Sequence, residues 1–138
     1  MNELVRRRDA TQATVDAWQG RKFKLGHADC VRLAADHLRR MGHTVRLPAK
    51  GRYATLRSAQ KELIARGYKD LPAALDGMGF ERIPPASARP GDVIAIPSEH
   101  AIGCLMVAVG NGRALGFHQD VEGAEILQPM EYEGAWRL

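Results

Sequence analysis

The sequence predicts an α+β fold in which helices come first along the chain and an antiparallel sheet follows. Up to about residue 80, apolar side chains recur at helical spacing, whereas after Ile83-Pro84-Pro85 they form short runs separated by turn residues. A chain of 138 residues with 45% hydrophobic content can close one core. We therefore expect a single domain over residues 1–138, with residues 1–20 as a helical N-terminal extension.

Four helices are expected in the first part of the chain, over residues 9–19, 30–41, 56–67 and 71–77. Polar caps mark three of the starts: Asp9 or Thr11 for the first helix, Thr55 for the third and Asp70 for the fourth. Glycine follows or ends each helical pattern, as is typical of helix C-termini. The third helix is expected to turn four apolar side chains inward: Leu56, Ala59, Leu63 and Ile64.

The strands are expected after Pro90-Gly91, a turn dipeptide. Residues 93–96 form a short buried strand and residues 101–109 a longer one. The Gly110-Asn111-Gly112 turn then folds residues 113–119 back as a hairpin partner. Residues 125–127 and 135–138 are expected to close the sheet.

The charge pattern favours a solvated basic surface. The formal net charge is +4, but the basic residues are scattered except at Arg6–Arg8 and Arg21–Lys24, and no nucleic-acid-binding motif accompanies them. We expect no nucleic-acid partner; such a surface would suit an anionic polymer such as bacterial cell wall. The sequence has no apolar run long enough to span a membrane and no signal peptide, so we expect synthesis in the cytoplasm.

Cys30 is the first candidate for chemistry, because it begins an amphipathic helix directly after Asp29. The positive end of the helix dipole and the unpaired N–H groups of the first turn both favour a thiolate. The alternative is a small apolar core residue. The second cysteine, Cys104, is expected in the core, and both cysteines are expected as free thiols.

His100 is the candidate base, at the entrance of the predicted 101–109 strand. With the turn centred on Asn111, opposed hairpin residues sum to about 222, so Cys104 faces His118 and Ile102 faces Asp120. Alternation along strands then places His100, Cys104, His118 and Asp120 on one face. Asp120, diagonal to His100, is the first candidate to orient its ring, and His118 is the second. A zinc site from Cys30, His100, Cys104 and His118 matches no tight metal motif.

Three segments together resemble the NlpC-type cysteine peptidases, a papain-like group that cleaves peptidoglycan stem peptides. They are Gly26-His27-Ala28-Asp29-Cys30 opening a helix, Arg89-Pro90-Gly91-Asp92-Val93 entering a strand, and His100 before the Gly-Asn-Gly hairpin. Further segments are similar to an NlpC-like branch encoded among phage and prophage tail genes: Gly51–Leu56, Ala88–Asp92 and Ala135–Leu138.

The resemblance implies a papain-like core in which N-terminal helices pack on a C-terminal antiparallel sheet. It also implies a catalytic Cys30, a base at His100, a third polar residue on the return strand, and a peptidoglycan peptide as substrate. No cofactor or metal is implied. The phage-tail likeness implies tail-tip or hub proteins as partners and the virion as a destination.

Two departures from the family pattern leave an inactive docking component of a phage tail as the alternative. The family follows Asp-Cys with Ser-Gly, whereas this chain has Val31-Arg32. The family's His-Val-Gly is here one residue longer, from His100 to Gly103, and if Gly103 sets the register, the histidine position falls on Ala101. His27 is expected in the loop or at the site's rim, and His37 and His43 are expected to be exposed.

Overall fold

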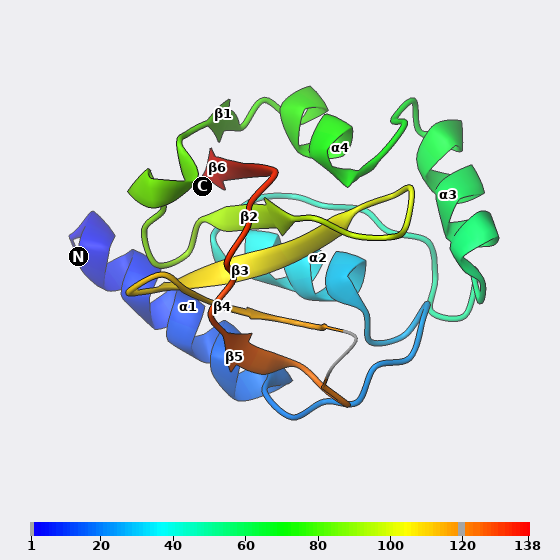
Figure 1. The fold of residues 1–138 in the computed structure, drawn as a ribbon. Coiled ribbons are helices and arrows are strands. Elements are labelled where there is room, and N and C mark those ends of the chain that lie inside the picture. Colours follow the sequence, from blue (N-terminus) through cyan, green and yellow to red (C-terminus); the bar gives the residue numbers. More distant parts are fainter. Residues whose placement is uncertain (1, 119–120) are drawn as a thin grey trace.

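The computed structural model describes residues 2–118 and 121–138 and shows an α+β fold. The described residues contain four helices, a six-stranded antiparallel sheet and one 3-10 turn at Pro85–Ser87 (Figure 1). No helix among these residues is both long enough and apolar enough to cross a membrane. The predicted order, helices before sheet, is therefore confirmed.

The helices are α1 (Glu3–Trp18), α2 (Cys30–Arg40), α3 (Leu56–Ala65) and α4 (Leu71–Gly77). Caps at Thr55 and Asp70 are confirmed: each side chain accepts a backbone N–H from the first turn. The predicted start of α1 at Asp9 or Thr11 is wrong. Asn2 caps this helix through the N–H of Val5, and Arg6 pairs with Glu3, so polar contacts carry the helix through a segment with little apolar periodicity.

The sheet has the strand order β1-β6-β2-β3-β4-β5. Its strands are β1 (Glu81–Arg82), β2 (Val93–Ile96), β3 (Cys104–Gly110), β4 (Arg113–Gly116), β5 (Glu125–Leu127) and β6 (Gly134–Arg137). In the β3–β4 hairpin Val107 faces Leu115 and Ala108 faces Ala114, which is the predicted register, and the pairing shifts between Ala108 and Gly110. The turn residue Asn111 has φ 55°, the left-handed conformation that this tight reversal needs.

Side-chain alternation gives the sheet two apolar faces. Val93, Ala95 and Leu105 face the helices and join a cluster with Leu38 of α2 and Leu75 of α4. The opposite face carries a second buried cluster, which short flanking segments cover: Ile94, Ile96, Met106, Ala108, Ala114 and Ala135. The sheet is therefore buried on both sides, and its helix-facing layer positions the start of α2.

The third helix departs from prediction in how much of it is buried. Of the four side chains expected to turn inward, only Ala59 is buried, and Ile64 is 58% exposed. The reason is that α3 lies at the margin of the helical layer, where only a narrow stripe of its surface meets the core (Figure 1). Leu56, at its first turn, lines a pocket instead.

His37 is fully buried, so its predicted exposure is wrong. Its Nε2 lies 2.8 Å from the Gly91 carbonyl, which can only accept, and its Nδ1 lies 2.8 Å from the Thr14 hydroxyl. The neutral ring thus ties α2 to α1 and to the turn before β2. Burial, with a further contribution from nearby Arg7, lowers the pKa of His37 below its ordinary value of 6.5.

Because His37 has a lowered pKa in the folded state, the unfolded chain binds its proton more readily. Stability from the neutral ring is complete above the unfolded pKa of about 6.5 and is lost as the pH falls through the folded value. We expect the free energy of unfolding, measured in urea, to decrease between pH 7 and pH 5 by about 1 kcal/mol. His37→Gln, which cannot titrate, is expected to show a flatter profile, and equal slopes would contradict this assignment.

Candidate functional site

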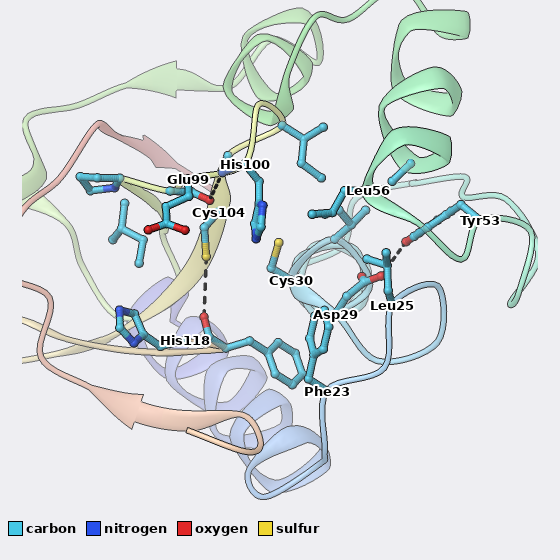
Figure 2. A pocket seen from close by; sticks show the side chains of 18 of the residues that line it. Phe23, Leu25, Asp29, Cys30, Tyr53, Leu56, Glu99, His100, Cys104 and His118 are labelled. Carbon is cyan, nitrogen blue, oxygen red and sulfur yellow. Dashed lines mark hydrogen bonds between the residues drawn. The ribbon is translucent and has the colours of Figure 1, made fainter. Parts of the chain in front are cut away.

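A pocket of about 750 Å³ opens at the start of α2. Its walls come from the segment before α2, the first turn of α3, the loop over residues 97–103, the start of β3 and the residues just after β4 (Figure 2). Cys30, His100, Cys104 and His118 all line it. These four residues, which span 88 positions of the sequence from Cys30 to His118, therefore meet in one cavity.

Cys30 is the first residue of α2, as predicted, and the residue is partly buried. The cap is Asp29, whose Oδ1 accepts the N–H of Arg32 at 2.8 Å. The Leu33 N–H is bonded to the Asp29 carbonyl, while the N–H of Cys30 belongs to the first turn, which has no intrahelical acceptor. The cap thus fixes the position of the Cys30 thiol at the N-terminus of α2, and this end of the helix borders the pocket.

Asp29 is 2% exposed and acts as a brace for this segment. Its Oδ2 accepts the backbone N–H of Gly26 at 2.8 Å and the hydroxyl of Tyr53 at 2.9 Å. Gly26 has φ +84° and lies so close to the Tyr53 backbone that a Cβ there would be 2.1 Å from the Tyr53 oxygen. The structure therefore gives the Gly26–Cys30 motif a structural role: Gly26 forms a tight turn against the Tyr53 backbone, and Asp29 holds Cys30 at the start of α2.

Tyr53 belongs to the site although the sequence reasoning did not single out its side chain. Burial, followed by the charge and hydrogen bond of Asp29, strongly raises the pKa of the phenol, so it remains a donor at neutral pH. The signal in the sequence was indirect: Tyr53 lies within the Gly51–Leu56 segment that carried part of the family resemblance.

Replacing Tyr53 by Phe removes one of three donors to a buried carboxylate. We expect Tyr53→Phe to lower the free energy of unfolding by about 1–3 kcal/mol, measured by urea denaturation, because Asp29 is left partly unsatisfied. Tyr132→Phe alters a tyrosine that is 37% exposed and serves as the matched control, with an expected change of about 0.5 kcal/mol or less. Equal effects of the two substitutions would show that the Asp29 bond contributes no net stability.

His100 lies in the loop before β3 rather than at the entrance of a strand, because β3 begins at Cys104 and not at residue 101. A turn closes this loop, with the Gly103 N–H donating to the His100 carbonyl at 3.0 Å, and the His100 N–H donates to Ser98 Oγ at 3.1 Å. Strand alternation therefore does not explain its position. The turn nevertheless brings the imidazole into the pocket on the side of the Cys30 sulfur (Figure 2).

Cys104 is half-buried and packs against the core cluster around Met106, as predicted, and it also lines the pocket. As the first residue of β3, it directs its sulfur toward the Phe117 carbonyl at 3.7 Å and toward Cys30 (Figure 2). The sequence did place Cys104 on one face with His118, and the hairpin register agrees with that arrangement. The sequence did not predict that the start of α2 lies close to this end of β3.

The two cysteines line the same pocket, and each affects the ionisation of the other. Interaction with Cys104, together with burial, raises the pKa of Cys30 well above its ordinary value. Interaction with Cys30 lowers the pKa of Cys104. Two adjacent negative charges repel, so the pair gives up one proton readily and keeps the second. The raised pKa of Cys30 runs against the expectation that the helix start makes this residue a thiolate, because the neighbouring thiol and burial act in the opposite direction.

His118 follows β4 and lines the pocket together with His100 and Cys104. Asp120, the first candidate to orient His100, lies outside the described residues. His27 is half-buried beside Gly51 and is not among the described residues that line the pocket. Within the described residues, no three His, Cys, Asp or Glu side chains form a group that could hold a metal ion.

The remaining pocket wall is mostly apolar. Two exposed side chains, Phe23 and Leu56, form part of its rim, and none of the described lining residues is Lys or Arg. Val31 lines the pocket, whereas Arg32 turns away and donates to the carbonyls of Pro48 and Ala49. Of the two residues that differ from the family's Ser-Gly, Arg32 therefore lies outside the pocket, and Val31 is the one whose side chain occupies space in it.

Solved structures with a similar fold are NlpC/P60 proteins. The chain is similar to the peptidoglycan hydrolase RipB of Mycobacterium tuberculosis, with TM-score 0.60 and 12% identity over 99% of this chain and 68% of that one. It is also similar to NlpC1 of Trichomonas vaginalis, with TM-score 0.58 and 16% identity over 94% of this chain and 43% of that one. The chain thus spans less than half the length of NlpC1, and at these identities the likeness establishes the fold.

A third similar structure is RipD of Mycobacterium tuberculosis, described as a non-catalytic NlpC/p60 domain protein adapted to peptidoglycan binding. Its TM-score is 0.50 and its identity 14%, over 96% of this chain and 97% of that one. No curated protein matches the sequence. The model of one family, described as Domain of unknown function (DUF6950), matches residues 3–138. The chain therefore belongs to this family and has the NlpC/P60 fold.

Proposed function

We propose that this protein is a cysteine hydrolase that cleaves peptidoglycan stem peptides, with Cys30 as the nucleophile and His100 as the base. The observation that carries the proposal is the meeting of a thiol at a helix start and a histidine ring in one open pocket (Figure 2). This is the arrangement that thiol hydrolases use. The fold shared with RipB, a peptidoglycan hydrolase, supports the choice of substrate.

In the proposed reaction, the Cys30 sulfur attacks the carbonyl carbon of a peptide bond while His100 takes the thiol proton. The C–N bond breaks, the amine leaves with the proton from His100, and the acyl group remains on sulfur as a thioester. Water, deprotonated by His100, then hydrolyses the thioester and restores the thiol. In this proposal the backbone N–H of Cys30, which belongs to the first turn of α2 and has no intrahelical acceptor, donates to the oxyanion.

The third residue in this proposal is Asp120 or His118, which would hold the His100 ring in a productive orientation. His118 lines the same pocket, and Asp120 follows it by two positions. We expect Asp120→Asn to lower the rate of peptide release on the order of 10-fold or more, and His118→Ala to lower it less. The release assay described below measures both, and the opposite ranking would assign the orienting role to His118.

The test is digestion of purified peptidoglycan by the native chain, with released peptides identified by mass spectrometry. We expect soluble stem peptides to appear, to vanish when the thiols are blocked with methyl methanethiosulfonate, and to return after reduction. Sedimentation with the same peptidoglycan measures binding separately. Release that persists with blocked thiols would contradict the proposal, as would the absence of release by a folded chain.

The second candidate function is a non-catalytic docking or peptidoglycan-binding module, and the raised pKa of Cys30 favours it. The similarity to RipD offers a precedent for such a role within the fold. Binding without release would select this function. The rate of iodoacetamide labelling of Cys30 across a pH series discriminates further, because a nucleophile assisted by His100 reacts at a lower pH than a thiol without assistance.

For the biological setting we propose a phage or prophage tail, with tail-tip or hub proteins as partners and synthesis in the cytoplasm before assembly. The support is the sequence resemblance of Gly51–Leu56, Ala88–Asp92 and Ala135–Leu138 to tail-encoded NlpC-like proteins. Delivery by a virion would also bring the pocket to the cell wall. Detection of the chain in purified virions by mass spectrometry tests this setting.

A further inference from the structure

The Cys30 and Cys104 thiols form a feature that hydrolysis does not use. Cys30 begins α2 and Cys104 begins β3, and although 74 positions of sequence separate them, both line the same pocket (Figure 2). A hydrolase needs a single sulfur. A second thiol in contact with the first gives the pocket a chemistry that neither cysteine has alone.

Both sulfurs are held by backbone elements that pack against each other. The Asp29 cap fixes Cys30 at the first position of its helix, and Cys104 is fixed by its pairing with Ile96 in the sheet. Both cysteine residues are partly exposed and line the open pocket, through which a small reagent can approach them (Figure 2). The remainder of the wall near the two sulfurs includes His100 and Ile102, and no described lining residue is a lysine or arginine that would hold a competing anion.

We propose that Cys30 and Cys104 are a redox modification site, at which a small-molecule disulfide such as oxidised glutathione converts the two thiols into an intramolecular disulfide. One protein thiolate attacks the small disulfide, forming a mixed disulfide and releasing one glutathione thiolate. The second protein thiolate then attacks the protein sulfur of that mixed disulfide, forms the Cys30–Cys104 bond and releases the second glutathione. The two protein thiols lose two electrons and two protons, and the glutathione disulfide takes them up and becomes two molecules of reduced glutathione.

The ionisation of the pair supports this sequence. Contact between the thiols lowers the pKa of Cys104, so a thiolate is available for the first attack. Once that sulfur is capped, no neighbouring negative charge hinders ionisation of the other thiol, and its nucleophilicity increases. Oxidation would remove Cys30 from any hydrolytic reaction, and a reductant would restore it.

The test is equilibration of the full chain with defined ratios of reduced to oxidised glutathione, followed by acid quenching and intact-mass measurement. We expect a monomer whose mass is lower by two hydrogens, with both free thiols lost and no glutathione retained. Peptide mapping without reduction is expected to identify one Cys30–Cys104 peptide pair. These readouts do not involve peptidoglycan, so they succeed or fail independently of the proposed hydrolase function.

Two single variants are matched controls: Cys30→Ser and Cys104→Ser. Each is expected to stop at one glutathione adduct on its remaining cysteine, because no second thiol is present to displace it. A wild-type chain that accumulates two adducts, forms only intermolecular dimers, or stays reduced at the most oxidising ratio would overturn the proposal. Mapping of the wild-type chain decides the question even if a variant fails to fold.

Discussion

Cys30→Ala is expected to abolish release of soluble peptides from peptidoglycan, with a loss on the order of 10³-fold or more, if the proposed hydrolase function holds. No other group in the proposed reaction can form the thioester. The melting temperature is expected to change little, because Cys30 is only partly buried and lies between the core and the wall of a cavity. Rates are measured by mass spectrometry of released peptides, and stability by thermal unfolding.

The matched control is Cys104→Ala, which removes the other thiol of the same pocket. Because the neighbouring Cys104 thiol raises the pKa of Cys30, this change is expected to lower that pKa and to speed alkylation of Cys30 at neutral pH. Peptide release should persist. Normal release by Cys30→Ala together with a clear loss of stability would instead assign Cys30 to packing, where truncation costs on the order of 1 kcal/mol or more.

Local signals were sufficient for most helix ends and for the main hairpin. Thr55 and Asp70 cap their helices as predicted, since a cap depends only on a side chain and the three residues after it. The hairpin register followed from one turn with Asn111 at positive φ. The two-residue strand β1 and the early start of α1 were missed, because pairing with β6 and polar capping create them without an apolar pattern.

The sequence indicated several residues that line the pocket, but it predicted less of how they are arranged. Cys30 and His100, the pair proposed from the sequence, line one pocket, although a turn closed by Gly103 positions His100 and strand alternation does not. The proximity of Cys30 to Cys104 could not be predicted from the sequence, because it depends on how α2 packs on the sheet. Tyr53 was missed for a similar reason: its partner Asp29 is 24 positions away.

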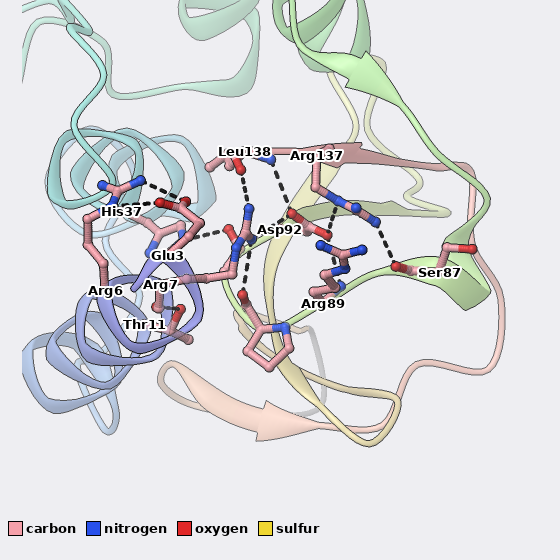
Figure 3. A network of polar contacts seen from close by, with 12 residues as sticks. Glu3, Arg6, Arg7, Thr11, His37, Ser87, Arg89, Asp92, Arg137 and Leu138 are labelled. Atoms are coloured by element: carbon pink, nitrogen blue, oxygen red, sulfur yellow. Dashed lines mark hydrogen bonds and ion pairs between the residues drawn. The ribbon is translucent and has the colours of Figure 1, made fainter. Parts of the chain in front are cut away.

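The Arg89–Val93 motif, which contributed to the family resemblance, is explained by a buried ionic network (Figure 3). The Asp92 carboxylate has no exposed surface. It accepts bonds from Arg7 Nη1 at 2.8 Å, from Arg137 Nε at 3.0 Å and from the backbone N–H groups of Arg89 and Leu138. Arg7 is itself buried and also donates to the Pro90 and Leu138 carbonyls. One carboxylate therefore joins α1, the entrance of β2 and the end of β6.

Asp92→Ala is expected to lower the free energy of unfolding by about 3–5 kcal/mol, measured by urea denaturation. The substitution leaves the buried Arg7 guanidinium without its counter-charge and deprives two backbone N–H groups of their acceptor. Glu62→Ala, which breaks an exposed pair with Arg66 at 2.8 Å, is the matched control, with an expected change of about 0.5 kcal/mol or less.

The double variant Asp92→Ala/Arg7→Met tests the cause of this loss. If the uncompensated charge dominates, removing Arg7 as well should recover part of the stability, because methionine fills much of the same space without a charge to bury. Arg7→Met alone should also be destabilising, since it leaves the Asp92 carboxylate with only Arg137 as a charged partner. Strictly additive losses would show that the two groups act independently, and the lost backbone bonds would then account for the effect at Asp92.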